Sequence, residues 1–564
     1  MKKQVYFILL TGILLGFATP QFAQENPRDK GLNAITKEAL QGQLEFLASD
    51  WMEGRETGTK GEYMASDYIA SMFKLYGLTP GGDLEQIRGG GRGQRPAAGA
   101  APATRPDPKR TYFQNINFVE FSAGPTQEMS VITKNGNASR SVDFGYKTDF
   151  LVAPGAVGME AEVPVVFVGY AFTDEKNGYD DLKGLDLKGK IVIRLSGTPG
   201  SKDINSKAFA KFKPVVPVVD PNAPRQMRPG GFGMEKWATD RGVLAILTYS
   251  PNADPTSQWV ANFPFRYNTA TYEGDVPQVT RSNKSMQIMD DKLSSQMIRL
   301  TVTQRVINEI ISGTGLDFAA IEKQIGETCK PASRELTGKF IKIKTTVESR
   351  IVKGRNVIGV IEGKNPDEIV VIGGHYDHLG KYDGYVYNGA DDNGSGTVGV
   401  MTIAKAMMAT GIKPEKTMVF CAWTGEEKGL LGSKFFNDHP YKDKILCDLN
   451  FDMISRNDPG ENQDNKIMMN YSNKFPISKD LTEKFNKEYN MGLEVKYTGS
   501  DKPGGGSDHA SFANKDIPIY YFMAGMPPEY HKPNDQIELV VWDKFLKIVQ
   551  LGYLSMYEIV QTWK

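Results

Sequence analysis

The sequence predicts an α/β protein with a mixed, mostly parallel sheet flanked by helices, and a separate β-rich domain. After Arg355, continuously apolar runs alternate with helical patterns, as expected for strands that are covered on both faces. Between residues 128 and 345 the chain instead carries short β runs separated by Gly- and Pro-rich stretches. A chain of 564 residues also exceeds the size that one core usually reaches, so two packed units are expected.

Residues 1–24 predict a secretory signal peptide. Two lysines precede an apolar stretch from Val5 to Ala18, and a Thr-Pro break and small or polar residues follow it. The stretch is shorter than the roughly 20 apolar residues of a membrane-spanning helix. We therefore expect an exported protein, periplasmic or secreted, with no stable membrane insertion once the signal has been removed.

Residues 25–127 predict N-terminal helices that pack on something larger. Apolar residues at helical spacing form two patterns between residues 35 and 77, the second of which ends at Gly77. Residues 88–108 consist mainly of Gly, Arg, Ala and Pro without interleaved aromatic residues, which favours a flexible surface insert over a nucleic-acid-binding segment. Lys plus Arg and Asp plus Glu both number 67, so the charge balance gives no reason to expect nucleic acid as a partner.

The C-terminal unit, residues 346–564, shows a regular order of strand, loop and helix. The predicted strands are NVIGVIEG, EIVVIGG, TMVFCAWTG, KILCDLNFDMI and IPIYYFMAG. The predicted helices cover residues 397–410, 428–438 and 478–488, and a last helix runs to the C-terminus. In open α/β sheets ligands bind beyond the carboxyl ends of the strands, so the residues that follow each strand are the candidates for a site.

Residues of the types that bind metals follow almost every one of these strands: His375 and Asp377, Asp391 and Asp392, Glu426 and Glu427, Asp452, and Tyr530 with His531. Each has an ordinary alternative when taken alone. Asp392 is also suited to a helix N-terminus, and Glu426 and Glu427 to a solvated turn. Four of the five histidines nevertheless fall in these loops, namely His375, His378, His509 and His531.

The chemistry of this set indicates a transition metal. Two imidazoles with three carboxylates suit Zn²⁺, with Mn²⁺ or Co²⁺ as alternatives, whereas Mg²⁺ and Ca²⁺ favour oxygen ligands alone. Five ligands exceed the needs of one open tetrahedral zinc, which predicts two ions that share a bridging carboxylate, and Asp392 lies between the two sets in the chain. Glu426 is then expected to act as general base, and Asp377 to accept the imidazole N–H of His375.

The motifs GGHYDHLG, NGADDNGSG, WTGEEKGLLGS, NFDMI and YHKPNDQIE, in this order, resemble the M28 family of co-catalytic zinc peptidases. The resemblance covers residues 350–564 and implies a zinc exopeptidase-like fold with two zinc ions. It implies one ion on His375 and Asp452, a second on Glu427 and His531, Asp392 as the bridge, Glu426 as base, Asp377 beside the ligands and Tyr530 stabilising an oxyanion. A cis peptide after Asp392 is also implied.

The segment between residues 128 and 345 is similar to the protease-associated (PA) domain that some family members carry. VVFVGYAF, DLKGKIVIRLSG and ATDRGVLAILTYS are the stretches that resemble it. This similarity predicts a PA-like domain inserted between the N-terminal helices and the rest of the catalytic unit.

The leading hypothesis is an exported aminopeptidase that removes N-terminal residues from peptides, using a water held by the metal pair and Glu426 as base. A glutamate-carboxypeptidase-like enzyme uses the same metals, and Arg456 is a candidate for holding a substrate carboxylate. A non-catalytic, receptor-like binding module would be expected to have lost ligands or the base, and none is missing from the sequence.

Overall fold

The computed structural model describes residues 26–85, 109–146, 148–153, 158–213, 236–249, 284–289, 298–382 and 384–563. The expected signal peptide (residues 1–24) and the expected flexible insert (residues 88–108) lie outside these ranges. None of the helices within them is both long and apolar enough to cross a lipid bilayer.

A mixed sheet forms the C-terminal unit, with the strand order β19-β18-β20-β17-β13-β16-β12. The strands are β12 (Arg334–Ile361), β13 (Asn365–His375), β16 (Lys416–Trp423), β17 (Lys444–Phe451), β18 (Lys466–Ser472), β19 (Glu494–Ser500) and β20 (Ile519–Met523). The pairs β16-β13, β13-β17, β17-β20 and β18-β19 are parallel, whereas β12 and β18 join antiparallel neighbours. The predicted fold class, a mostly parallel sheet flanked by helices, is confirmed.

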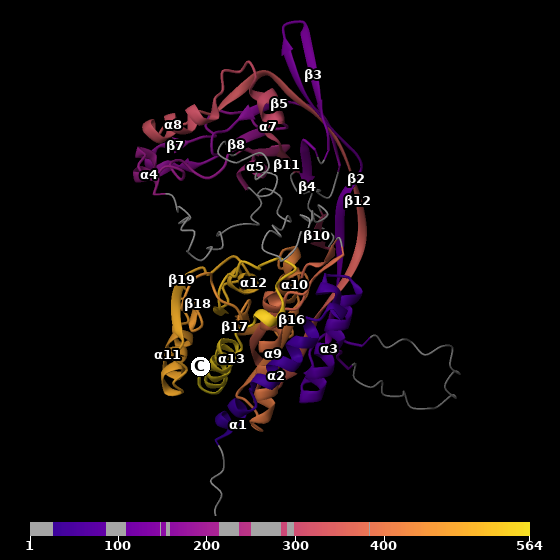
Figure 1. The fold of residues 1–564 in the computed structure, drawn as a ribbon, viewed down its shortest axis with the longest axis vertical. Coiled ribbons are helices and arrows are strands. Elements are labelled where there is room, and N and C mark those ends of the chain that lie inside the picture. The colour runs from indigo at the N-terminus through magenta and orange to yellow at the C-terminus, as the bar shows by residue number, and fades with distance from the viewer. Residues whose placement is uncertain are drawn as a thin grey trace, which may run out of the picture.

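Helices cover this sheet (Figure 1). They are α1 (Pro27–Asn33), α2 (Lys37–Leu47), α3 (Lys60–Tyr76), α9 (Gly396–Ala409), α10 (Leu431–Asp438), α11 (Ile477–Glu488), α12 (His509–Ala513) and α13 (Trp542–Thr562). The helical patterns predicted from the sequence are confirmed within a few residues at each end. Helix α3 ends as predicted at Gly77, whose φ of 92° is a left-handed cap that glycine adopts without steric cost. The N-terminal helices α2 and α3 pack on α9, although more than 300 residues separate them in the sequence.

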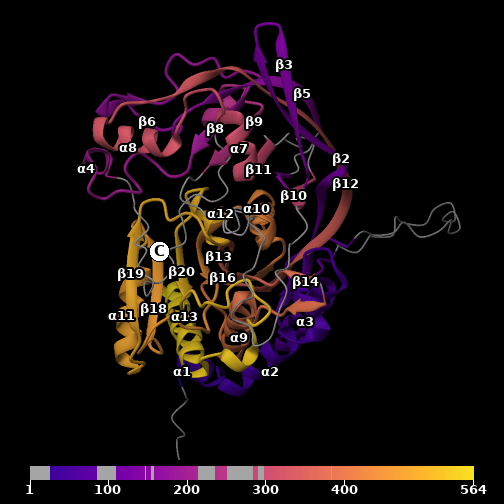
Figure 2. The ribbon, with the colours of Figure 1, turned by 45° about the horizontal axis from the view of Figure 1, so that its top comes forward.

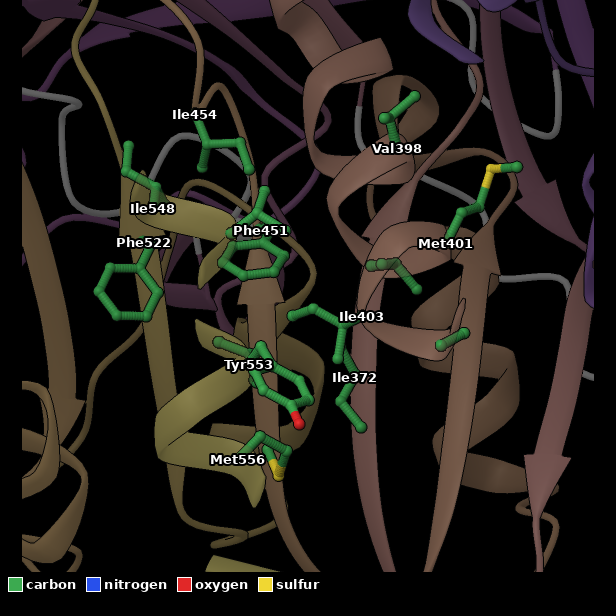
Figure 3. Packing of buried hydrophobic residues seen from close by; sticks show 14 of the residues in the cluster. Ile372, Val398, Met401, Ile403, Phe451, Ile454, Phe522, Ile548, Tyr553 and Met556 are labelled. Carbon is green, nitrogen blue, oxygen red and sulfur yellow. The ribbon is translucent and has the colours of Figure 1, made fainter. Parts of the chain in front are cut away.

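The main core lies between the sheet and helices α9 and α13. Ile372 of β13, Phe451 of β17, Ile403 of α9 and Tyr553 of α13 are fully buried and belong to one cluster (Figure 3). Burying a side chain of this size stabilises the fold by about 1.5–3 kcal/mol. The cluster holds the strands in place, so the loops at their carboxyl ends have a rigid support.

A second core lies in the inserted segment, above the first in Figures 1 and 2. Its strands are β4 (Phe150–Ala153), β5 (Met159–Phe167), β8 (Ile191–Leu195), β9 (Ala245–Tyr249) and β11 (Ile298–Val302), of which β5, β8, β9 and β11 pair in parallel. Helices α4 (Lys207–Phe212), α5 (Lys236–Asp240), α7 (Gln304–Ile311) and α8 (Phe318–Thr328) accompany them. The insert therefore contains helices as well as the expected strands.

A long antiparallel ribbon joins the two cores along one side of the molecule (Figures 1 and 2). Strand β2 (Phe113–Asn135) pairs with β12 from Phe113 opposite Val357 to Thr133 opposite Lys339. Strand β3 (Ala138–Phe144) pairs with the C-terminal end of β2, and strand β10 (Lys284–Ile288) pairs with β2 from Phe118 to Ser122. The expected domain limits at residues 127/128 and 345/346 fall inside these continuous strands and not in linkers.

The remaining short elements lie in the loops. They are β1 (Thr79–Pro80), β6 (Thr173–Asp174), β7 (Tyr179–Asp180), β14 (Gly380–Tyr382), β15 (Tyr385–Tyr387), η1 (Asp50–Arg55), η2 (Glu175–Asn177), η3 (Ala390–Ser395), η4 (Glu426–Lys428) and η5 (Ile537–Leu539).

Candidate metal centre

The five predicted ligands meet at one edge of the sheet. His375 is the last residue of β13, Asp452 follows β17 directly, and Glu427 lies in η4 after β16. Asp392 lies in η3 and His531 in the loop after β20. Because β13, β16, β17 and β20 run in parallel, their carboxyl ends share this edge and bring the five side chains together.

One group of ligand atoms forms around His375. Its Nε2 lies 3.4 Å from Asp392 Oδ1 and 3.5 Å from Asp452 Oδ1. Asp452 Oδ1 is buried and has no hydrogen-bond partner among the described residues. The donor atoms of these three side chains lie close enough together to hold a single metal ion.

A second group of ligand atoms forms around His531 and includes the other carboxylate oxygen of Asp392. His531 Nε2 lies 3.0 Å from Asp392 Oδ2 and 3.2 Å from Glu427 Oε2. Asp392 therefore faces both groups, one with each carboxylate oxygen. This is the arrangement expected of a bridging ligand between two ions.

The residues of both groups fit zinc. Imidazole nitrogens and carboxylate oxygens are ordinary zinc ligands, and an unpaired carboxylate is costly to bury. The Asp392 side chain is only 4% exposed, and burial together with the nearby Glu427 charge raises the pKa of Asp392 to about 7. A bound cation would relieve the burial of this charge.

Asp535 holds the loop that carries Asp392 in place. The backbone N–H groups of Asp391 and Asp392 donate to the Asp535 carboxylate at 3.0 Å each. The peptide bond between Asp392 and Asn393 is cis, as the family resemblance implied. The Asn393 side-chain amide donates to Phe451 O at 2.9 Å, which ties the loop to the end of β17.

Glu426 lies beside the first group. Its Oε2 is 3.8 Å from His375 Nε2, and its side chain is 13% exposed. Burial raises the pKa of Glu426 well above its usual range. The carboxyl group is therefore poised to exchange a proton at the edge of the centre, which is what a general base and acid must do.

Asp377 occupies a different place from the one predicted. His375 Nδ1 lies 3.1 Å from the backbone carbonyl of Asp377 but 3.7 Å from its carboxylate. The prediction assumed extended chain through Asp377, whereas β13 ends at His375. The carboxylate instead accepts from Thr57 Oγ1 at 2.9 Å and from the backbone N–H of Glu426 at 3.0 Å, so it fixes the loop of Glu426.

Tyr530 packs on its neighbour in the chain. The rings of Tyr530 and His531 stack with centroids 3.7 Å apart and an interplanar angle of 22°. Burial and the nearby carboxylates raise the pKa of Tyr530, which keeps the phenol protonated as a donor. The tyrosine thus packs directly on the ring of a predicted ligand.

Arg55 is the main contributor that the sequence analysis missed. It lies between α2 and α3 and is only 1% exposed. Its guanidinium donates to the carbonyls of Tyr376 (2.7 Å), Asn388 (2.7 Å), Gly389 (3.0 Å) and Leu47 (2.6 Å). One side chain therefore clamps the loop after β13 to the loop that leads to Asp392.

Two further residues of this N-terminal segment hold the same loops. Thr57 donates to the Asp377 carboxylate. The buried Glu62 carboxyl interacts with the hydroxyl groups of Thr424 and Tyr376, and it accepts from Gly58 N at 2.6 Å. The sequence carries a signal for this segment, because GRETGTKG separates two helical patterns and contains three glycines.

Removal of metal should destabilise the protein, because a ligand that binds only the folded state stabilises it by mass action. At a free ion concentration about 100 times the dissociation constant, that stabilisation amounts to about 2.7 kcal/mol. We expect a chelator to lower the midpoint of thermal unfolding and added Zn²⁺ to restore it, as measured by calorimetry. Zinc-saturated chelator is the control, and an unchanged midpoint in free chelator would argue against a metal centre.

Comparison with known proteins agrees with this geometry. Residues 356–553 match Peptidase family M28. Leupeptin-inactivating enzyme 1 of Streptomyces exfoliatus is 34% identical over 184 residues, which cover 32% of this chain and 38% of that enzyme. A glutamate carboxypeptidase 2 homolog of Caenorhabditis elegans is 31% identical over 400 residues, or 64% of this chain and 48% of the relative. The chain thus spans less than half the length of these curated relatives.

A solved structure shares the fold. The aminopeptidase from Aneurinibacillus sp. strain AM-1 superposes with a TM-score of 0.54 at 18% identity, covering 95% of this chain and 97% of that one. Identity this low shows the fold alone, but the superposition extends over the inserted unit as well as the C-terminal sheet. Residues 356–553, which hold the five candidate ligands, match the signature of peptidase family M28.

Proposed function

We propose that the chain is a zinc-dependent exopeptidase of the aminopeptidase type, which removes residues from the N-termini of peptides. The observation that carries the proposal is the pair of ligand groups that share Asp392, with the Glu426 carboxyl 3.8 Å from His375 Nε2 beside them. The named aminopeptidases among the similar proteins support the reaction class.

Each of the candidate residues would have a distinct role in the reaction. His375 and Asp452 would hold one zinc ion, Glu427 and His531 a second, and Asp392 both; when bound, the ions would polarise the scissile carbonyl and acidify a water molecule. Glu426 would take the proton of the attacking water and deliver it to the leaving amine. The Tyr530 hydroxyl would donate to the oxygen on which negative charge develops.

The state of Arg456 favours an aminopeptidase over the glutamate-carboxypeptidase alternative. Its Nη2 lies 2.6 Å from Glu529 Oε2, and the two side chains are 9% and 17% exposed. The Glu529 carboxylate already balances the charge of this guanidinium, so a substrate carboxylate would gain less from binding to it.

The inserted unit would restrict access to chain ends. Met286 of β10 packs with Phe118 of β2 and with Leu431, four residues after Glu427, so the ribbon lies against the loop of the proposed base. We propose further that the inserted unit is a PA-like domain, as its sequence stretches resemble one. A unit so close to the centre would keep folded proteins out and admit flexible peptide termini.

Export also stays a proposal, supported by the basic and then apolar start of the sequence. We expect N-terminal sequencing of the protein purified from its native source to begin near Ala23 or Gln24. A mature protein that retains Met1 would contradict this proposal and leave the peptidase proposal untouched.

The activity is tested with a panel of aminoacyl chromogenic substrates and matched peptides blocked at the N-terminus. We expect release of the chromophore from free aminoacyl substrates, loss of that activity in chelator and its return with Zn²⁺. Blocked peptides should resist, because the free amine is part of the recognised group. Shortening of blocked peptides from the C-terminus, followed by mass spectrometry, would support the carboxypeptidase alternative.

A further inference from the structure

We propose that His378 is an additional ligand of the second ion, together with Asp392, Glu427 and His531. The inference rests on the proposed metal centre but adds a residue to it. His378 lies in the loop after β13, three residues beyond His375, and its side chain is fully buried.

The donor atoms of His378 point to this position. Its Nδ1 lies 2.8 Å from Glu427 Oε1 and 3.9 Å from Asp392 Oδ2. The nitrogen of His378 and the oxygens of the two carboxylates lie close enough together to hold one ion, as do those of His375, Asp392 and Asp452. Asp392 is the member common to both sets.

The hydrogen bonds of His378 give a physical reason for a cation. His378 Nδ1 and Glu427 Oε1 face one another at 2.8 Å without the alignment of a hydrogen bond, and among the described residues the second ring nitrogen, Nε2, has no partner. A buried polar group without a partner costs about 1–3 kcal/mol. An ion between the imidazole and the carboxylate would satisfy both groups at once.

The fold provides a place for the His378 ring. The His378 backbone N–H donates to Arg55 O at 3.2 Å, which anchors the residue to the N-terminal segment. The ring lies over Gly389, where a Cβ atom would come within 2.5 Å of Cδ2 of the imidazole. Gly389 also has a φ of 55°, a conformation that glycine adopts readily, so a side chain at this position would both be strained and displace the ring.

The two ion sites would then differ in chemistry. The first would have one imidazole, from His375, and the second would have two, from His378 and His531, whose ring centroids lie 5.9 Å apart. Because nitrogen ligands favour zinc over harder cations, the second site would retain its ion more tightly. The pair would therefore load and lose zinc in a fixed order.

The test begins with the wild-type protein loaded with Zn²⁺ and examined by X-ray absorption spectroscopy, which counts imidazole ligands. We expect three imidazoles for two ions, whereas two imidazoles for two ions would overturn the inference. This measurement requires no variant and no catalytic activity. A wild-type protein that holds no zinc would instead overturn the proposed function itself.

The variants His378→Ala and His378→Asn are then titrated with a chelator while bound zinc is measured by elemental analysis. We expect one ion to be lost at a chelator concentration at least about tenfold lower than in wild type, and the imidazole count to fall by one. Asn, whose side chain reaches the position of Nδ1, should restore part of the affinity. His439→Ala, on the surface away from the centre, is the control; equal zinc retention in His378→Ala and wild type would contradict the inference.

Discussion

Replacement of Glu426 by Gln is expected to lower kcat by about a hundredfold to ten-thousandfold. The amide keeps the shape of the side chain but cannot take a proton from water or return it to the leaving amine. The backbone N–H of Glu426, which donates to Asp377, is unchanged by the substitution, so the loop should keep its position. The measurement is the turnover of an aminoacyl substrate with zinc content determined on the same sample.

The zinc content shows whether activity is lost because the base is missing or because the ions are no longer bound. We expect Glu426→Gln to retain the same number of ions as wild type, because the glutamate lies beside the first group without belonging to either ligand set. Glu427→Gln is the matched comparison, and we expect it to lose zinc as well as activity. Turnover of Glu426→Gln within a few-fold of wild type would show that another group is the base.

Replacement of Arg55 by Met is expected to destabilise the protein by about 3 kcal/mol or more. The substitution leaves four buried carbonyls without their donor, and each unsatisfied group of this kind costs about 1–3 kcal/mol. Burial lowers the pKa of Arg55 only to about 10, so a positive charge is also lost beside the carboxylates of the centre. Chemical unfolding measures the first effect and zinc affinity the second.

Arg55→Lys tests whether geometry or charge dominates. An ammonium retains the charge but cannot reach four carbonyls in different directions as the planar guanidinium does, so we expect only partial recovery of stability. Arg140→Met is the control, because it removes an arginine that is 64% exposed and pairs with Glu309, a surface pair worth less than about 1 kcal/mol. Equal stability of Arg55→Met and Arg140→Met would contradict the role of the clamp.

The sequence predicted the ligand-bearing loops because those residues follow apolar strands directly. His375 and Asp452 are adjacent to strand ends in the chain, so the rule for parallel sheets located them without knowledge of any long-range contact. No comparable rule predicts the position of Arg55. Its contact with Tyr376 O joins residues 321 positions apart, and a lone arginine between two helices usually faces solvent.

The long ribbon was missed for a different reason. Strand β12 is buried on alternate residues along its first part. From Asn356 to Val360, where it enters the main core, it is buried on both faces. This change of pattern occurs within one strand, but in the sequence it resembles the boundary between two domains. The short helices α7 and α8 were not predicted, although each places three apolar residues in the second core.

The clamp at Arg55 and the support at Asp535 lie near opposite ends of the chain, and the ligands fall between them. During synthesis a ribosome releases the N-terminal part long before Asp535 emerges, so a nascent chain lacks the scaffold that orients Asp392. Metal capture must then be a late event that follows translation of nearly the whole polypeptide. A truncated translation product that ends before residue 535 would lack the carboxylate that accepts from the backbone N–H groups of Asp391 and Asp392.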